Sequence, residues 1–161
     1  MKVVIVNRQQ TRKINLRLLK KITGGLLAGL EIENAELGVN LVAETEMILL
    51  NETFLRHRGP TDVITFDYSS AERGVRSAES RLHGEIFVCV DEAIRQAKKF
   101  GATWQLEIVR YIIHGVLHLL GHDDSRPAAR RKMKREENRW LSRLSRRFSL
   151  AQLARATKLG A

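Results

Sequence analysis

The spacing of apolar residues along the chain predicts short strands alternating with helices. Continuous or alternating apolar runs, which are typical of strands, lie at Val3–Val6, Glu36–Ala43, Val63–Tyr68 and Gly84–Val90. Apolar residues about four positions apart, which are typical of helices, mark Arg12–Leu27, Glu44–Leu55, Asp91–Phe100, 104–120 and Arg126–Leu144. Strands and helices mix without a regular strand–helix–strand repeat, so the pattern favours an α+β fold.

The predicted helix over residues 104–120 is apolar on nearly all sides, so we expect it to be the central buried helix. It begins behind Thr103, a good N-cap, and it carries His114 and His118. Residues four apart on a helix differ by about 40° in direction and about 6 Å in rise. Two imidazoles at this spacing can converge on one ion at about 2.0–2.1 Å from each nitrogen. The pair therefore predicts a metal site.

The end of this helix decides which residue is the third ligand. If the helix continued to His122, the histidines from His114 onward would form a stripe about 12 Å long, which no single ion spans. Gly121 lets the chain reverse in the left-handed conformation, so the helix is predicted to end near Leu120. In such an ending, His122 packs back on the last turn near Leu117.

Two aspartates follow this predicted turn. Asp124 can swing under the face of the two histidines, and the spacing H-x-x-x-H-x-x-G-x-x-D equals that of the three metzincin ligands. Asp124 is therefore the predicted third ligand, with His122 as the alternative. Asp123 is expected to support the turn or to make a hydrogen bond to one of the ligands.

Gly115 stands where a zinc protease of the pattern H-E-x-x-H carries its catalytic glutamate. Without that carboxylate the site lacks the group expected to activate water for peptide hydrolysis. A metal ion can still lower the pKa of a water molecule or polarise a phosphoryl oxygen. A metal without the protease base, next to a basic surface, favours phosphodiester over peptide chemistry.

The net charge of +10 is concentrated at one end of the chain. Residues 1–125 hold 16 Lys and Arg against 16 Asp and Glu, whereas residues 126–161 hold 12 Lys and Arg against 2 Glu. Such a block predicts contact with a polyanion, most often nucleic acid, and the alternative is a solvated helix face with a frayed tail. The candidate RNA-binding residues here are Arg130, Arg131 and Lys134, and residues 145–161 are predicted to form a basic C-terminal extension.

Other features of the composition favour a cytoplasmic protein. The apolar runs are too short to span a bilayer, and the N-terminus lacks the pattern of a secretory signal. The single cysteine, Cys89, allows no internal disulfide and is expected to be a small buried hydrophobe. Neither a membrane partner nor an organic cofactor is expected.

Several segments together resemble a known family, the YbeY endoribonucleases, which are bacterial rRNA maturation factors. The resemblance covers residues 40–144 and rests on HGVLHLLGHDD (114–124), Leu50-Asn51, PTDVITF (60–66), GEI (84–86) and the positions Met133, Glu137 and Leu141. It implies a single α+β domain, here residues 1–144, with a small four-stranded mixed sheet and helices around the metal-binding helix. It also implies one bound metal ion, usually zinc although another divalent metal is compatible, and metal-dependent cleavage of single-stranded RNA. The implied role is 16S rRNA 3′-end maturation and ribosome quality control, with rRNA and the 30S subunit as partners.

Two positions depart from the family pattern. Family members usually read H-G-x-L-H-L-x-G-Y-D-H, so Asp124 replaces a histidine ligand and His122 replaces a tyrosine. The negative charge of Asp124 should make a water molecule bound to the metal less acidic than it would be in a site with three histidines. The family carries an arginine important to its activity at the position that is Leu55 here, and Arg56 follows one residue later. Arg58, which lies nearby in the sequence, is a further candidate RNA-binding residue. Arg56 is the predicted catalytic arginine, because a guanidinium can clamp a phosphate, and the alternative is a solvated loop arginine.

The leading hypothesis is a metal-dependent endoribonuclease in which either water or the RNA 2′-hydroxyl attacks phosphorus. One alternative is a non-catalytic ribosome-assembly or RNA-binding factor with a structural metal. The other is a zincin-like metallopeptidase whose base is supplied from elsewhere in the chain.

Overall fold

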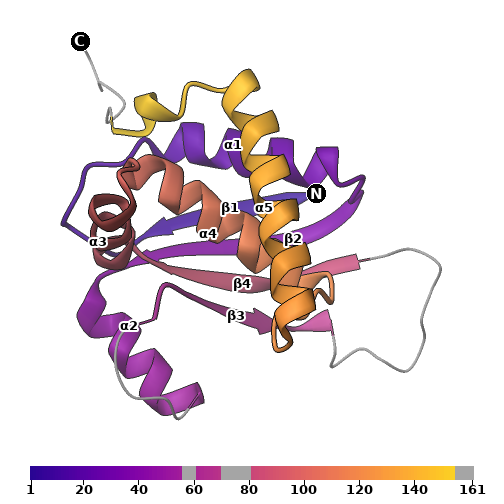
Figure 1. The fold of residues 1–161 in the computed structure, drawn as a ribbon, viewed down its shortest axis with the longest axis horizontal. Helices are drawn as coiled ribbons and strands as arrows, with labels where there is room; N and C mark the ends of the chain where they lie inside the picture. The colour runs from indigo at the N-terminus through magenta and orange to yellow at the C-terminus, as the bar shows by residue number, and fades with distance from the viewer. Residues whose placement is uncertain (56–60, 70–80, 155–161) are drawn as a thin grey trace.

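The computed structural model describes residues 1–55, 61–69 and 81–154 of the chain (Figure 1). Its strands are β1 (Lys2–Asn7), β2 (Asn34–Val42), β3 (Val63–Asp67) and β4 (Arg81–Cys89). Its α-helices are α1 (Leu16–Gly29), α2 (Glu44–Leu50), α3 (Val90–Phe100), α4 (Trp104–Leu119) and α5 (Pro127–Arg147). A π-helical turn, η1 (Asn51–Leu55), follows α2, and a 3-10 helix, η3 (Leu150–Ala154), follows α5.

The four strands form one mixed sheet in the order β1-β2-β4-β3. The pairs β1–β2 and β2–β4 are parallel, whereas β3 runs antiparallel to β4 with Val63 opposite Val88. β3 is therefore an edge strand, which pairs with β4 alone among the strands of the sheet. The predicted α+β domain with a small four-stranded mixed sheet is confirmed.

Helices α1, α4 and α5 lie on one face of the sheet (Figure 1). The main core lies between them, and it includes Ile86 and Val88 of β4 together with Leu26 of α1 and Leu144 of α5. α4 is the most deeply buried of these helices, since ten of its residues are buried. The prediction of a central buried helix is thus confirmed.

A smaller core lies on the other face of β3 and β4. Side chains alternate across a strand, so Phe87 and Cys89 point away from the main core and pack with Ile64 and with Met47 of α2. Phe66 stands edge-on to Phe87, with ring centroids 5.6 Å apart. Cys89 is the buried hydrophobe predicted from its flanks, and burial raises the pKa of its thiol to about 11.

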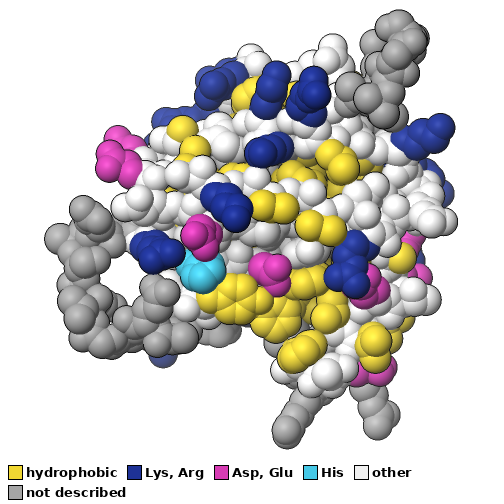
Figure 2. Space-filling view, turned by 180° about the vertical axis from the view of Figure 1, so that it is seen from behind, with side chains coloured by type: hydrophobic (Ala, Val, Ile, Leu, Met, Phe, Trp, Pro, Cys, Tyr) yellow, Lys and Arg dark blue, Asp and Glu magenta, His cyan; other side chains and the backbone are white. Residues whose placement is uncertain are grey.

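The rest of this second face lies at the molecular surface, where hydrophobic side chains gather (Figure 2). Val4, Val6 and Tyr68 are exposed and line a shallow hollow of about 280 Å³ across β1, β2 and β4. The candidate chemistry of the chain does not lie here but on the helical side of the sheet.

The start of α1 differs from the sequence prediction. The helix begins at Leu16, and Asn15 is the N-cap, since its side chain accepts a hydrogen bond from the Leu18 N–H. Thr11, which directly precedes the predicted helix start at Arg12, instead donates its hydroxyl to Asp91 at the start of α3. The side chain of Thr11 is thus used in a long-range contact and does not cap the helix.

The C-terminal part of α5 extends beyond the predicted end, to Arg147. The following η3 buries Leu150 and Leu153 in the main core, and Asn15 donates its backbone N–H to the Leu153 carbonyl. Residues up to Ala154 therefore pack on the domain, and residues 155–161 lie outside the described part. A boundary at residue 144 stays a prediction. Among the helices described, none is both long and apolar enough to span a bilayer.

Candidate metal centre

α4 supplies two histidines one turn apart. Thr103 caps the helix as predicted, accepting a hydrogen bond from the Leu106 N–H. The imidazoles of His114 and His118 both remain partly accessible, and their Nε2 atoms are 2.9 Å apart. The helix therefore presents two imidazole nitrogens to one point at the protein surface.

The turn after α4 has the geometry that the glycine predicted. Gly121 adopts φ +97°, and its N–H donates to the His118 carbonyl at 2.9 Å. The N–H of His122 donates to the Leu117 carbonyl at 3.0 Å, which completes a Schellman ending. Both the end of the helix and the packing of His122 against the last turn are confirmed.

Beyond this turn the chain brings Asp124 to the histidine pair. Its Oδ2 lies 3.4 Å from His118 Nε2 and 3.6 Å from His114 Nε2. Three ligands at about 2.0–2.1 Å from a tetrahedral ion are about 3.4 Å from one another, so this triangle matches a zinc-like site. His114, His118 and Asp124 could hold a metal ion, and within the described residues His122 is not part of the group.

Asp123 stabilises the turn, as predicted. Its carboxylate accepts hydrogen bonds from the Ser125 N–H and from the Ser125 hydroxyl. These bonds lower the pKa of Asp123, the side-chain bond contributing most. The two adjacent aspartates thus have different tasks, one in the turn and one beside the histidines.

Glu137 of α5 supports the first histidine. His114 donates its Nδ1–H to Glu137 Oε2 at 2.8 Å, and the Glu137 side chain is only 8% exposed. This bond leaves the Nε2 of His114 free for an ion, as carboxylate partners do in many metal sites. Burial acts to lower the pKa of His114, but the hydrogen bond and charge of Glu137, with the charges of Asp62 and Asp124, raise it above 6.5.

Arg110 neutralises the charge around Glu137. Its guanidinium lies 3.8 Å from Glu137 and 3.7 Å from Glu107, and it donates a hydrogen bond to Asn138 at 2.8 Å. The position of Glu137 had been noted only as part of the family resemblance. A pairing between α4 and α5 carries no local sequence signal, so only the tertiary structure could reveal its role.

Gly115 faces the sheet and not the site. A Cβ at this position would lie 2.8 Å from Ile86 of β4, which is closer than side-chain atoms approach. A glutamate here would therefore collide with the core. Gly115 lets α4 lie directly on β4, and the absence of the protease base at this position follows from packing.

The candidate site also faces the edge strand β3. A hollow of about 280 Å³ lies between β3 and α4, and its lining includes Thr61, Asp62, His114 and Asp124. Asp62 directly precedes β3, and its carboxylate accepts a hydrogen bond from the Val63 N–H at 2.8 Å. Although Asp62 retains accessible surface, crowding protein atoms desolvate its carboxyl group and raise its pKa.

The predicted RNA-binding residues and the predicted catalytic arginine differ in where they lie relative to the candidate metal site. Arg130 and Lys134 line a groove of about 550 Å³ together with His114 and Asp124, so the structure brings them to the candidate metal site. Arg131 is exposed on α5 and is not among the residues that line this groove. Arg56, the predicted catalytic arginine, and Arg58 lie outside the described residues.

The protein is thus a four-stranded α+β domain in which two histidines of the central helix and an aspartate beyond its C-terminal turn lie together at a groove. The sequence model of the family described as Endoribonuclease YbeY matches residues 4–145. The chain belongs to this family, as the resemblance in its motifs had indicated.

Curated relatives agree with this assignment. A protein of Aquifex aeolicus named Endoribonuclease YbeY is 32% identical over 142 residues, which are 88% of this chain and 91% of that protein. One of Syntrophotalea carbinolica with the same name is 31% identical over 147 residues, covering 89% and 96%. One of Myxococcus xanthus is 36% identical over 125 residues, covering 78% of this chain but 42% of that longer protein.

A solved structure supports the fold. The solution structure of TM1509 from Thermotoga maritima covers 99% of each chain with a TM-score of 0.64 at 24% sequence identity. At this identity the likeness supports the fold alone.

Proposed function

We propose that this protein is a metal-dependent endoribonuclease that cleaves single-stranded RNA. The observation that carries the proposal is the triangle of His114 Nε2, His118 Nε2 and Asp124 Oδ2, with sides of 2.9–3.6 Å, in a chain of the YbeY family. These three residues would hold one divalent ion, and the donor set of two imidazoles and a carboxylate fits Zn²⁺. When bound, the ion supplies a Lewis acid beside the scissile phosphate.

The residues around the triangle have separate tasks in this proposal. Glu137 fixes the ring of His114 and its tautomer through the Nδ1–H. Arg130 and Lys134 supply positive charge along the groove, where they attract the phosphates that flank the bond to be cleaved. Arg56 would neutralise charge on the phosphate in the transition state, and Arg58 would bind the adjacent backbone.

The proposed biological role rests on the family to which the chain belongs. We assign the protein to 16S rRNA 3′-end maturation and ribosome quality control in the cytoplasm, with rRNA in the 30S subunit as its partner. The basic residues of α5 and of the extension to residue 161 support this assignment, because rRNA is a polyanion.

One experiment tests the activity. The zinc-loaded protein and a chelated sample are incubated with a 16S rRNA 3′-end fragment, as single strand and as duplex, and the products are analysed for their termini. The proposal expects metal-dependent cleavage of the single strand alone. A 2′,3′-cyclic phosphate identifies the 2′-hydroxyl as the nucleophile, and a linear phosphate identifies water. If the chelated protein cleaves as fast as the loaded one, the proposal is wrong.

The accessibility of the triangle argues against a purely structural metal. The side chains of His114, His118 and Asp124 are 23%, 28% and 40% exposed, so an ion held by them would be accessible to a ligand from solution. Structural zinc sites are closed by four protein ligands, and open sites are typical of catalysis. The peptidase alternative would need its base from another residue, because a glutamate at Gly115 would collide with Ile86.

A further inference from the structure

The groove beside the candidate metal centre extends far beyond the three ligands. Its floor is α4, from His114 back to Leu106, and this distance of eight residues is about 12 Å along the helix. α3 and α5 form its two walls, through residues that include Phe100 on one side and Lys134 on the other. Its volume of about 550 Å³ lies within the range of sites for small ligands.

The part of the groove that lies beyond His114 along α4 has the chemistry of a base-binding site. Phe100, the last residue of α3, is 69% exposed although its ring is large and apolar. Tyr111 lies on the floor and is 5% exposed, and its hydroxyl has no hydrogen-bond partner among the described residues. Aromatic faces stack on bases, and a buried hydroxyl without a partner is costly unless a ligand or water satisfies it.

The α5 wall of the groove has the chemistry of a phosphate-binding surface. Arg130 and Lys134 line it, and neither has an acidic side-chain partner within the described part of the chain. The carboxylates of Glu107 and Glu137 in the groove are already engaged by Arg110 and His114. The charges left for a ligand on this wall are therefore positive.

The geometry points to a nucleotide subsite in this groove. It takes the nucleotide that adjoins the scissile phosphate, with the base stacked on Phe100 and hydrogen-bonded by Tyr111. The phosphate of this nucleotide lies against Lys134 and Arg130, between the base and the metal centre. This inference rests on the proposed function and deepens it, because it predicts that one base beside the cleaved bond is recognised.

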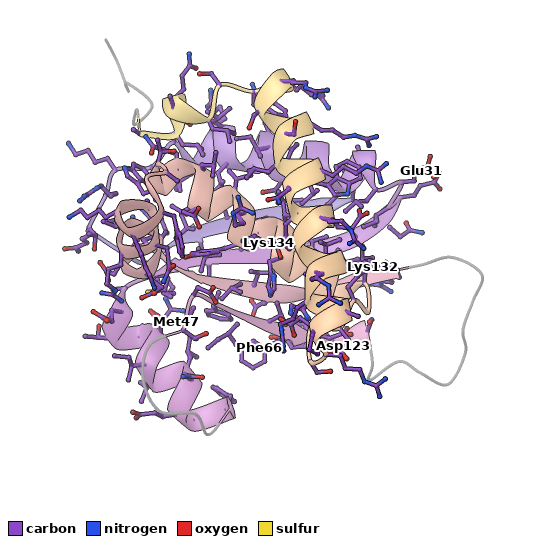
Figure 3. The ribbon with its side chains drawn as sticks, viewed as in Figure 1. Glu31, Met47, Phe66, Asp123, Lys132 and Lys134 are labelled. Atoms are coloured by element: carbon purple, nitrogen blue, oxygen red, sulfur yellow. The ribbon has the colours of Figure 1, made fainter. Side chains whose placement is uncertain are left out.

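The chain offers a matched control for the phosphate contact. In Figure 3, Lys134 leaves α5 on the side of α4, whereas Lys132 leaves the same helix on the opposite side. Both side chains are exposed, and only Lys134 lines the groove. A change at Lys132 thus removes the same charge from the same helix without touching the subsite.

The test compares binding of adenosine 5′-monophosphate with binding of ribose 5-phosphate, which lacks the base, by NMR titration of the zinc-loaded protein. We expect the nucleotide to bind roughly tenfold more tightly. Phe100→Ala should erase this preference and Phe100→Trp should keep it. Lys134→Ala should weaken both ligands severalfold, and Lys132→Ala should change neither. Unchanged thermal unfolding of each variant shows that the fold is intact.

Two results would overturn the subsite: equal binding of the two ligands to the wild type, or a preference that persists in Phe100→Ala. If either occurs while RNA is still cleaved, the subsite is wrong and the endoribonuclease stands. If RNA is not cleaved but the Phe100-dependent preference is present, the proposed function is wrong and the nucleotide site remains.

Discussion

Two stripes of side chains run along α4, one residue apart, and they have opposite roles. The stripe through Tyr111, His114 and His118 lines the grooves, and its polar groups are the ones that we propose bind an ion and a nucleotide. The neighbouring stripe through Ile112 and Gly115 is buried, and Gly115 touches β4. Adjacent residues on a helix differ by about 100° in direction, so the side chains that line the grooves and those that pack on the sheet point to different sides of α4.

This difference explains why a histidine and a glycine are adjacent at His114 and Gly115. His114 can serve the site only while its position is fixed, and the close approach of α4 to β4 at Gly115 fixes it. Changes at the two histidines of the groove stripe should therefore alter metal binding and leave the fold intact. Changes in the buried stripe should alter the stability of the fold itself.

The largest expected effect comes from Asp124, which lies beyond α4 beside the two histidines of the groove stripe. Asp124→Ala removes one of three ligands, so its zinc affinity should fall by more than the roughly 100-fold typical of a lost supporting residue. Asp124→His, which restores the usual ligand of the family, should retain zinc. Metal analysis and calorimetric titration measure both.

His122→Ala is the matched control for this prediction, because His122 packs back on the last turn of α4 through its backbone. It should bind zinc as the wild type does. Loss of zinc in His122→Ala with full retention in Asp124→Ala would show that the ligand assignment is wrong.

The next effect concerns the partner of His114. Glu137→Gln keeps the size of the side chain but removes the charge that orients the ring, so zinc affinity should fall about 10- to 100-fold. The Nδ1 proton signal of His114 should shift in NMR spectra of the metal-free variant. Glu136→Gln, on the adjacent and more accessible position of α5, is the control and should leave both quantities unchanged.

Substitutions in the buried stripe should change the free energy of unfolding. Gly115→Ala places a Cβ against Ile86, so the free energy of unfolding should decrease by about 1–3 kcal/mol in urea denaturation. In Gly24→Ala the new Cβ has no neighbour within 4 Å, and a better helix former should stabilise α1 by about 0.5–1 kcal/mol. Equal effects of the two substitutions would contradict the packing argument.

The smallest expected effect is a pH dependence of the metal-free protein. The pKa of His114 is raised in the folded state, so its contribution to stability is complete below pH 6.5. This contribution is lost as pH rises through the folded pKa. Urea denaturation with a chelator should show the loss in the wild type, and Glu137→Gln should flatten it. An identical pH profile in both would mean that Glu137 does not hold the proton.

The local structure around the candidate site could be predicted from the sequence, but the contacts that other elements make with the site residues could not. The period of α4, its Thr103 cap and the reversal at Gly121 are local features, and each was predicted correctly. The start of α1 was not, because Thr11 bonds to Asp91, which is far away in the sequence. The support of His114 by Glu137 was missed for the same reason.

By itself, the sequence determined the pieces that depend on neighbours along the chain: a helix with histidines one turn apart, a glycine turn, and an aspartate three residues beyond it. The tertiary structure alone decided that Glu137 meets His114, that Gly115 meets Ile86, and that α3 and α5 form walls beside α4. Helical periods and turns arise from backbone geometry within a few residues. Contacts between helices and strands depend on how all their apolar faces are buried together, and this arrangement cannot be read from a short segment of sequence.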